Sequence, residues 1–420
     1  MIDLKLLREQ PDCIREALKK RGVDFDLDGL LNLEKQRREL LKGLESDREA
    51  LKWQSDEFAS RKATGQTSTP PPILRELSDR VTRKAQEVKA LEANFQAQLA
   101  YVPNIPHQSV PVGDSKANQV VRTVGKKPAL PFTPKTHLEL AERLKLMDFE
   151  RAAKVTGSHF PLFTGVGARL ERALINWMLD VHTKEHGYTE VSPPFLVNRT
   201  SMFGTGQLPK FEEDMYRLRN DDLFLVPTAE VPLTNLHRDE LLAGSALPLK
   251  YAAYTACFRR EAGSYGKETR GLVRVHQFDK VELVKLTSPE TSYDELERLV
   301  ADAEVILKRL GLHYRVVCLA TGDLGFAAAK CYDLEAWAPG LDQFLEVSSC
   351  SNFEAFQARR ANLRYRQAAT GKPAYVHTLN GSGVALARTL ICLLETHQRA
   401  DGHVAIPEPL RPYLDGQEQL

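Results

Sequence analysis

Apolar residues recur every three or four positions in two long stretches near the start of the chain. From about residue 27 to 62 they occupy two heptad positions, and the series is interrupted by Arg37, Asp47 and Gln54. A second series runs from about residue 73 to 101. The apolar members are Leu30, Leu33, Leu40, Leu44, Leu51 and Phe58 in the first stretch, and Leu74, Leu77, Val81, Val88, Leu91 and Phe95 in the second. This period predicts two long helices.

The segment between the two predicted helices, residues 63–72, reads ATGQTSTPPP and predicts a turn. Two long helices joined by a short connection are expected to lie antiparallel. We therefore predict an N-terminal helical arm over residues 1–102. Residues 103–115 contain three prolines and predict a linker, which leaves 116–420 as a second domain.

Beyond the linker, helical and strand-like patterns follow one another. Apolar residues at helical spacing predict helices at 136–149, 168–186, 293–310 and 384–397. Strand-like runs lie at 188–191, 223–227, 273–284 and 314–319. The sequence NGSG at 380–383 predicts a turn before the last helix.

Composition narrows the class of protein. The chain has 420 residues, a net charge of +1, 42% hydrophobic and 27% charged residues, which is typical of a soluble protein of two or three domains. No apolar run approaches the roughly 20 residues that a membrane span needs. Six cysteines are scattered without a C-x-x-C pair, which argues against a disulfide framework and a cysteine-rich zinc site. The N-terminus lacks an apolar targeting segment, so we expect a cytoplasmic protein with no membrane partner.

The charge of the arm leaves two interpretations open. Acidic and basic residues nearly balance over 1–102, so the total does not indicate a nucleic-acid partner. The arm could be a structural or dimerising coiled coil. Alternatively, local clusters such as Arg37-Arg38 and Arg61-Lys62 could contact the phosphates of an RNA.

The stretch from Cys257 to Val284 predicts two strands joined by the polar loop 262–270. Alternation places Arg259 and Glu261 on one face. On the return strand the residues sharing a face are Arg274, Phe278, Lys280 and Glu282. A face with cations, a ring and acids suits a nucleotide and an ammonium group. The alternative is an ordinary solvated charged face.

This stretch resembles motif 2 of the class II aminoacyl-tRNA synthetases and, within that class, the seryl-tRNA synthetase family. The matching residues are Phe258-Arg259-x-Glu261, Gly263-Ser264, Thr269-Arg270-Gly271-Leu272 and His276 to Lys280. Further matches are the helix, strand and Pro193-Pro194 of motif 1, the loop 205–210, Thr228-Ala229-Glu230, the strand 344–352, the 380–398 segment of motif 3 and the C-terminal PEPLRPY. One departure is Ala387, where many relatives have glycine before Arg388.

The resemblance implies an α+β fold: a class II antiparallel sheet flanked by helices, with an N-terminal antiparallel coiled-coil hairpin. It also implies a homodimer whose arm grips the long variable arm of tRNA(Ser), with tRNA(Sec) left open. The implied reaction joins L-serine to ATP as seryl-adenylate and then transfers serine to the tRNA. ATP with Mg²⁺ is expected, and zinc is not.

The resemblance also implies the site residues. For ATP they are Arg259, Arg260, Glu261, Arg274, Val275, Phe278, Glu346, Val347, Ser348, Ser349 and Arg388. For serine they are Thr228, Ala229, Glu230, Arg259, Glu282, Asn380 and Ser382. Arg259 and Arg388 are the implied catalytic residues, and Glu346 with Ser349 would hold magnesium. Strict alternation pairs Glu346 with Ser348 instead, so this metal pair requires a bulge or a twist.

Other functions remain to be separated. Thr228 to Glu230 also fits a plain helix start. A relative that loads a carrier protein would lack the arm, and a non-catalytic RNA-binding descendant would be expected to have lost Arg259, Glu282 or Arg388. A threonine or proline enzyme is the third rival. Polar candidates in the amino-acid pocket favour serine, because a hydroxyl is read most strongly by hydrogen bonds.

Overall fold

The computed structural model describes residues 1–261 and 271–420. The motif residues Gly263, Ser264, Thr269 and Arg270 therefore lie outside the described residues. Contacts divide the described chain into two units. Residues 2–19 and 23–103 form the first, here called the arm unit, and residues 1, 20–22 and 104–420 form the second, here called the main unit.

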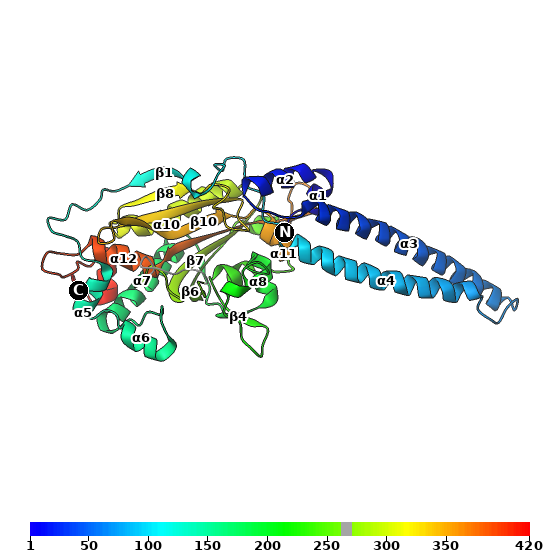
Figure 1. Cartoon of the computed structure of the whole chain (residues 1–420), viewed down its shortest axis with the longest axis horizontal. Coiled ribbons are helices and arrows are strands. Elements are labelled where there is room, and N and C mark those ends of the chain that lie inside the picture. The colour runs from blue at the N-terminus through cyan, green and yellow to red at the C-terminus, as the bar shows by residue number, and fades with distance from the viewer. Residues whose placement is uncertain (262–270) are drawn as a thin grey trace. The chain divides into compact units, whose positions relative to one another are not determined.

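The arm unit is helical. Its elements are α1 (Leu4–Glu9), α2 (Pro11–Lys20), α3 (Leu27–Ala63) and α4 (Pro72–Leu99). The long helices α3 and α4 run side by side (Figure 1), which confirms the predicted hairpin. Asp26 caps α3 by accepting a hydrogen bond from the Gly29 N–H. Pro71 is the N-cap of α4, and Pro72 is its first residue. A backbone N–H at the start of a helix has no partner within the helix, so the N–H that proline lacks is not missed there.

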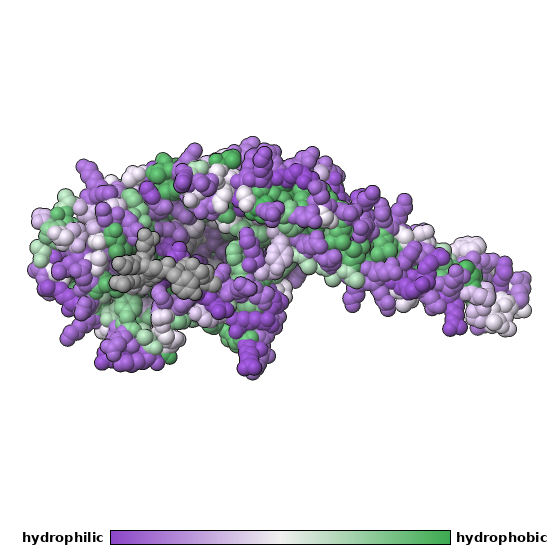
Figure 2. Space-filling model, viewed as in Figure 1, coloured by the Kyte–Doolittle hydropathy of each residue, from purple (hydrophilic) through white to green (hydrophobic). Residues whose placement is uncertain are grey.

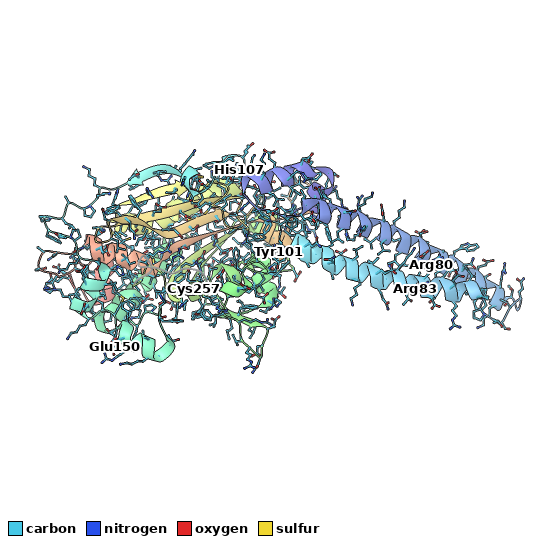
Figure 3. All side chains as sticks on the ribbon, in the orientation of Figure 1. Arg80, Arg83, Tyr101, His107, Glu150 and Cys257 are labelled. Atoms are coloured by element: carbon cyan, nitrogen blue, oxygen red, sulfur yellow. The ribbon has the colours of Figure 1, made fainter. Side chains whose placement is uncertain are left out.

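Two of the polar residues that interrupt the apolar series of the arm, Arg37 and Asp47, pair with residues of the other helix. Arg37 on α3 donates to Glu92 on α4 at 2.8 Å. Asp47 lies 2.7 Å from Arg80, which is labelled in Figure 3, and 2.8 Å from Lys84, and both partners belong to α4. Hydrogen bonds from Lys84 and Arg80 lower the pKa of Asp47. Arg37 and Asp47 therefore join the two helices by ion pairs, in addition to the apolar contacts between them.

An eight-stranded sheet organises the main unit. In spatial order its strands are β1 (Gln119–Val124), β8 (Tyr314–Cys318), β9 (Lys330–Ala338), β10 (Gln343–Asn352), β13 (His377–Ala385), β7 (Gln277–Thr287), β6 (Leu249–Phe258) and β2 (Thr189–Glu190). Every neighbouring pair is antiparallel except β2 and β6. The antiparallel sheet flanked by helices is thus confirmed, with one short parallel edge strand.

Apolar residues on β7 divide between the two faces of the sheet. Val281 and Leu283 belong to the main core, with helices α7 (Gly165–Lys184), α10 (Ser292–Arg309) and α12 (Leu386–Thr396). Val284 and Leu286 belong to a second cluster, with α9 (Glu230–Thr234) and α11 (Phe356–Arg360). Because α7, α10 and α12 cover the first face, a cavity can open only on the opposite face of the sheet.

Smaller elements complete the main unit. They are α5 (His137–Leu144), α6 (Phe149–Thr156), α8 (Arg199–Thr205), β3 (Leu196–Asn198), β4 (Leu223–Leu225), β5 (Leu241–Ala243), β11 (Arg364–Arg366), β12 (Pro373–Tyr375), and the 3₁₀ turns Ser115–Ala117, Glu212–Asp214, Gly244–Ala246 and Glu408–Leu414. Among the described residues, no helix combines the length and the apolar character that crossing a membrane requires.

Two predicted element bounds are wrong. The helix expected over 136–149 ends at Leu144, because Lys145 adopts a left-handed conformation with φ 52° that caps it. The return strand expected from residue 273 begins only at Gln277, so Arg274 does not lie on it.

The turn expected at 380–383 is also wrong, because these residues lie inside β13. Their glycines serve close packing in a strand. A Cβ on Gly381 would stand 2.8 Å from Cys350 Sγ, and one on Gly383 would stand 2.6 Å from His182 Nε2.

Candidate active site

A cavity of about 470 Å³ opens on the face of the sheet opposite α10 and α12. Figure 2 shows that the surface of the main unit is hollowed in this view. Its walls include residues that follow β6, the start of β7, β10 and β13, and the start of α12. Cys257 (Figure 3) marks the end of β6 at this site.

Most of the predicted site residues line this cavity. Those that do are Thr228, Glu230, Arg259, Glu261, Arg274, Val275, Phe278, Glu346, Val347, Ser349, Asn380, Ser382 and Arg388. Those that do not are Ala229, Arg260, Glu282 and Ser348. Ala229 is fully buried in the second apolar cluster, and Ser348 Oγ donates instead to the Ser382 carbonyl at 2.6 Å. Arg260 is exposed to solvent.

A β-bulge on β10 places the two predicted metal ligands together. Glu346 pairs with Glu335 on β9, and Ser348 pairs with Leu334, so Val347 is an extra residue. Ser349 then stands opposite Asp333. Because β9 is regular, Asp333 and Glu335 share a face, and their partners Glu346 and Ser349 do so too. The bulge that the predicted pair required is confirmed.

The residues at the end of β6 gather by loop geometry, not by strand alternation. Arg259 donates from Nε to the Pro227 carbonyl at 3.3 Å, and its guanidinium lies 5.3 Å from the centre of the Phe278 ring. Glu261 has φ 48° and accepts from Arg274 Nη1 at 2.8 Å. The predicted shared strand face is therefore wrong for Arg274 and Glu261, although both reach the cavity.

A hydrogen-bonded network forms one end of the cavity. Glu282 accepts from Asn380 Nδ2 at 2.9 Å and from Thr228 Oγ1 at 3.2 Å, and it forms an ion pair with Lys280. Lys280 Nζ is also 2.9 Å from Thr228 Oγ1. Strand alternation had placed Lys280 on the same face of β7 as Phe278 and Glu282, but no function was predicted for it from the sequence.

Glu230 is a second buried acid at this end. It accepts from Gln357 Nε2 at 2.6 Å. Burial, followed by the charge of Glu282, raises the pKa of Glu230 to about 7. Gln357 on α11 was not among the site residues predicted from the sequence.

At the other end of the cavity, Arg388 contacts the β10 acid. Its Nη1 lies 3.1 Å from Glu346 Oε2, and its Nε donates to the Val273 carbonyl at 3.2 Å. Asp333 lies beside this pair and was not predicted. Burial and the neighbouring charge of Glu346 raise its pKa, while Ser349 hydrogen-bonds to it.

The oxygen donors on this wall fit a magnesium ion. Glu346 and Ser349 offer hard oxygen ligands, and the carboxyl group of Asp333 stands opposite Ser349 on the neighbouring strand. Within the part of the chain that the structure describes, no group of three His, Cys, Asp or Glu side chains is placed to hold a metal. Magnesium commonly keeps several waters and only one or two protein ligands.

The antiparallel sheet, the arginine above a ring at the end of β6 and the arginine at the start of α12 together define a class II aminoacyl-tRNA synthetase core. Residues 210–397 match the family model of the tRNA synthetase class II core domain (G, H, P, S and T). Residues 1–106 match the seryl-tRNA synthetase N-terminal domain. The chain belongs to the seryl-tRNA synthetase family.

Relatives and solved structures agree along the whole chain. A serine–tRNA ligase of Syntrophobacter fumaroxidans is 54% identical, with 100% of each chain covered. The crystal structure of seryl-tRNA synthetase from Pyrococcus horikoshii complexed with ATP has a TM-score of 0.91 and 39% identity, covering 100% of this chain and 99% of that one. The cytoplasmic serine–tRNA ligase of Naegleria fowleri in complex with AMP has a TM-score of 0.86 and 32% identity, covering 100% and 98%.

Proposed function

We propose that this chain activates L-serine with ATP and transfers it to tRNA(Ser). The main observation that supports this proposal is a cavity with two chemically distinct ends. Arg259, Phe278 and Arg388 lie toward one end, and Thr228, Glu230 and Asn380 toward the other. The first set suits a nucleotide, and the second suits a small substrate with an ammonium and a hydroxyl. Membership of the seryl-tRNA synthetase family supports the same function.

In the first step, a serine carboxylate oxygen attacks the α-phosphorus of ATP. A new phosphorus–oxygen bond forms, and the bond to the pyrophosphate leaving group breaks. The carboxylate is already ionised at neutral pH, so the protein needs no general base. Alignment of the two substrates and stabilisation of the developing phosphate charge supply the catalysis.

For ATP, Arg259 binds the α-phosphate and the serine carboxylate, and the Phe278 ring stacks on adenine. Glu261 accepts from the adenine amino group. Arg274 and Arg388 bind the outer phosphates, which requires each to leave its present carboxylate partner. Guanidinium groups suit this because they bind phosphate and carboxylate through the same donor geometry.

For serine, Glu230 and Glu282 supply the acidic side of the pocket, with Thr228, Asn380 and Ser382 around them. Glu346 and Ser349 would hold magnesium. When bound, the ion would neutralise charge on the phosphates of ATP.

For the second step, we propose that the helices of the arm unit bind tRNA(Ser). A ribose hydroxyl of its terminal adenosine then forms an ester with the seryl carbonyl carbon, and the acyl–phosphate bond breaks with release of AMP. We also propose a homodimer built through the motif 1 elements α7 and β2, and a cytoplasmic location.

The first test is ATP–pyrophosphate exchange with a panel of amino acids and no tRNA. Exchange with serine and little with threonine, alanine or proline is expected. Exchange with none of them would show that the fold has lost its chemistry. Exchange with another amino acid would reject the serine assignment.

A further inference from the structure

The segment 324–329, which connects β8 to β9, forms part of the cavity surface. Its cavity-lining residues are Gly325, Phe326, Ala327 and Ala328. Three of these four are glycine or alanine, so few side-chain atoms are available to fix the segment by packing. It belongs to no helix or strand. The position of this part of the cavity therefore depends on hydrogen bonds to the backbone of the segment.

Arg21 binds three of the six carbonyl groups of the segment. Its Nη1 lies 3.3 Å from the Leu324 carbonyl and 3.3 Å from the Gly325 carbonyl, and its Nη2 donates to the Ala328 carbonyl. Residues 20–22 are part of the main unit, although the chain on either side of them belongs to the arm unit. A guanidinium presents five N–H donors in one plane, so this one side chain joins the two ends of the segment.

The other three carbonyl groups accept from the start of the Pro-rich segment. The backbone N–H of Asn104 donates to the Phe326 carbonyl at 3.0 Å, and its side-chain amide donates to the Ala327 carbonyl at 2.9 Å. The backbone N–H of His107, which is labelled in Figure 3, donates to the Ala329 carbonyl at 2.9 Å. Together with the guanidinium, these donors account for all six carbonyl groups.

The guanidinium of Arg21 is buried without an acidic partner. Arg21 is 6% exposed, and within the described part of the chain no carboxylate forms an ion pair with it. Burial lowers its pKa to about 10, so it still carries its charge at neutral pH. A buried charge that lacks an acid contributes little to stability, whereas hydrogen bonds from a charged donor are strong and directional. These features favour a role in fixing the geometry of the segment over a role in the stability of the fold.

The segment 324–329 lies at the amino-acid end of the cavity. The backbone N–H of Ala329 donates to the carbonyl of Asn352, the last residue of β10, at 2.8 Å. Asn380, a member of the proposed serine pocket, stands opposite the adjacent Ser351. A shift of the segment would therefore act first on the part of the cavity that receives the amino acid.

The segment also packs against the residues that follow α8. A Cβ on Gly206 would stand 3.3 Å from the Ala327 Cβ, so the two backbones lie close together. The side-chain amide of Gln357 donates to the Thr205 carbonyl at 3.1 Å and to Glu230 at 2.6 Å. A displacement of the segment therefore reaches Glu230 through one packing contact and one shared amide.

From this arrangement we infer that Arg21 and Asn104 are positioning residues for the activation of serine. Neither residue lines the cavity. They fix the segment 324–329, and the segment in turn fixes the surroundings of Glu230. This inference rests on the proposed activation of serine, and it assigns a part in that reaction to two residues distant in sequence from every motif of the site.

The chain offers a matched control in the same connection between β8 and β9. Asn118 accepts from the Ala320 N–H at 2.8 Å through Oδ1, and its amide donates to Asp323 at 2.7 Å. Neither of these partners lines the cavity. Asn118→Ala therefore loosens the connection outside the segment, whereas Asn104→Ala loosens the segment itself.

The experiment measures ATP–pyrophosphate exchange with serine for the parent, Arg21→Met, Arg21→Lys, Asn104→Ala and Asn118→Ala. We expect Arg21→Met to raise the KM for serine by about tenfold or more, and Asn104→Ala to raise it less, because small misplacements of binding groups weaken binding strongly. Arg21→Lys keeps the charge but not the planar donors, so its KM should lie between those of the parent and Arg21→Met. The KM for ATP should change by less than about threefold in every variant, and Asn118→Ala should keep the KM for serine within about twofold of the parent value.

The two kinetic constants separate positioning from folding. Partial unfolding lowers the active fraction, so it lowers kcat per total protein and leaves KM unchanged. Folded Arg21→Met with a KM for serine within about twofold of the parent value overturns the inference. An equal rise of this KM in Asn118→Ala and Asn104→Ala also overturns it.

Two further outcomes complete the test. If Arg21→Met does not fold by circular dichroism, Arg21→Lys and Asn104→Ala decide by the same criterion. A parent without serine exchange rejects the proposed function, and the inference falls with it. An active parent with unchanged variants rejects the inference alone.

Discussion

Glu230 is buried and also lines the wall of the cavity. Burial and the Glu282 charge raise its pKa to about 7. The neutral form therefore dominates below that pH in the folded protein, and the ionised form dominates above it. The unfolded chain releases the Glu230 proton near pH 4.5, whereas the folded protein holds it until about pH 7. The contribution of this group to the free energy of unfolding therefore falls as pH rises between these two values.

An ammonium substrate needs the ionised form of Glu230. We expect the KM for serine to fall as pH rises from 6 to 8, approaching about tenfold per pH unit below the pKa. Steady-state exchange across this range measures it. Glu230→Gln should flatten the profile and raise the KM for serine. A parent KM for serine that does not change across the range would contradict the assigned role.

Glu282 holds Lys280, Thr228 and Asn380 in place. Glu282→Ala should abolish serine-dependent exchange, because it leaves the Lys280 ammonium unpaired in a buried site. The matched control is Glu304→Ala, which removes a buried acid paired with Arg122 outside the cavity. Near-normal serine affinity in Glu282→Ala, measured by calorimetry, would reject the pocket assignment.

At the residue scale, the residues that line the cavity were predicted better than the buried residues behind them. Motif residues such as Arg259 and Arg388 can be placed because their types and spacing are characteristic. Glu282 was expected to face the ligand directly, but it does not line the cavity. Its burial depends on the packing between β7 and α9, which a local pattern does not reveal. Gln357 and Asp333 come from elements distant in sequence, and only the folded chain brings them to the site.

The long helices α3 and α4 belong to a unit of their own, which permits a test of each unit's function. Replacing residues 27–101 by a short flexible linker should leave exchange with serine near the parent level and reduce charging of tRNA(Ser) severely. The reason is that no residue of this segment lines the cavity. Retained charging of tRNA would mean that the arm is only structural.

Within the arm, the Asp47 ion pairs should stabilise the hairpin in a pH-dependent way. The lowered pKa means that this stabilisation is present above the ordinary carboxyl pKa and is lost as pH falls below it. Asp47→Asn should lower the melting temperature at pH 7 and change it little at pH 2, as followed by circular dichroism. Asp56→Asn, on the exposed side of α3, is the control. An equal effect of Asp47→Asn at both pH values would contradict this role.

At the element scale, strongly periodic segments could be predicted and tertiary exceptions could not. The arm helices match because their apolar series extends over many turns. The NGSG segment failed because glycines typical of turns serve here for close approach to Cys350 and His182. The register of the sheet likewise follows from long-range pairing, which no local pattern encodes.

For the whole molecule, the proposed homodimer is testable in solution. We expect sedimentation at twice the mass of the 47.2 kDa chain at micromolar concentration. The two-residue strand β2 ends the sheet and belongs to the motif 1 elements that would build the interface. A monomer at that concentration with full serine exchange would reject the dimer as a requirement for the first step.

The extra residue on β10 allows chain length and side-chain type to be tested separately at this wall. Deleting Val347 would keep every oxygen donor in the sequence and restore regular pairing with β9. Glu346 and Ser349 would then be two positions apart in a regular strand, so they would still share a face. The deletion would therefore remove the bend and added twist of the bulge while it preserves the donor pair, and it would separate the effect of strand curvature from the effect of the ligands.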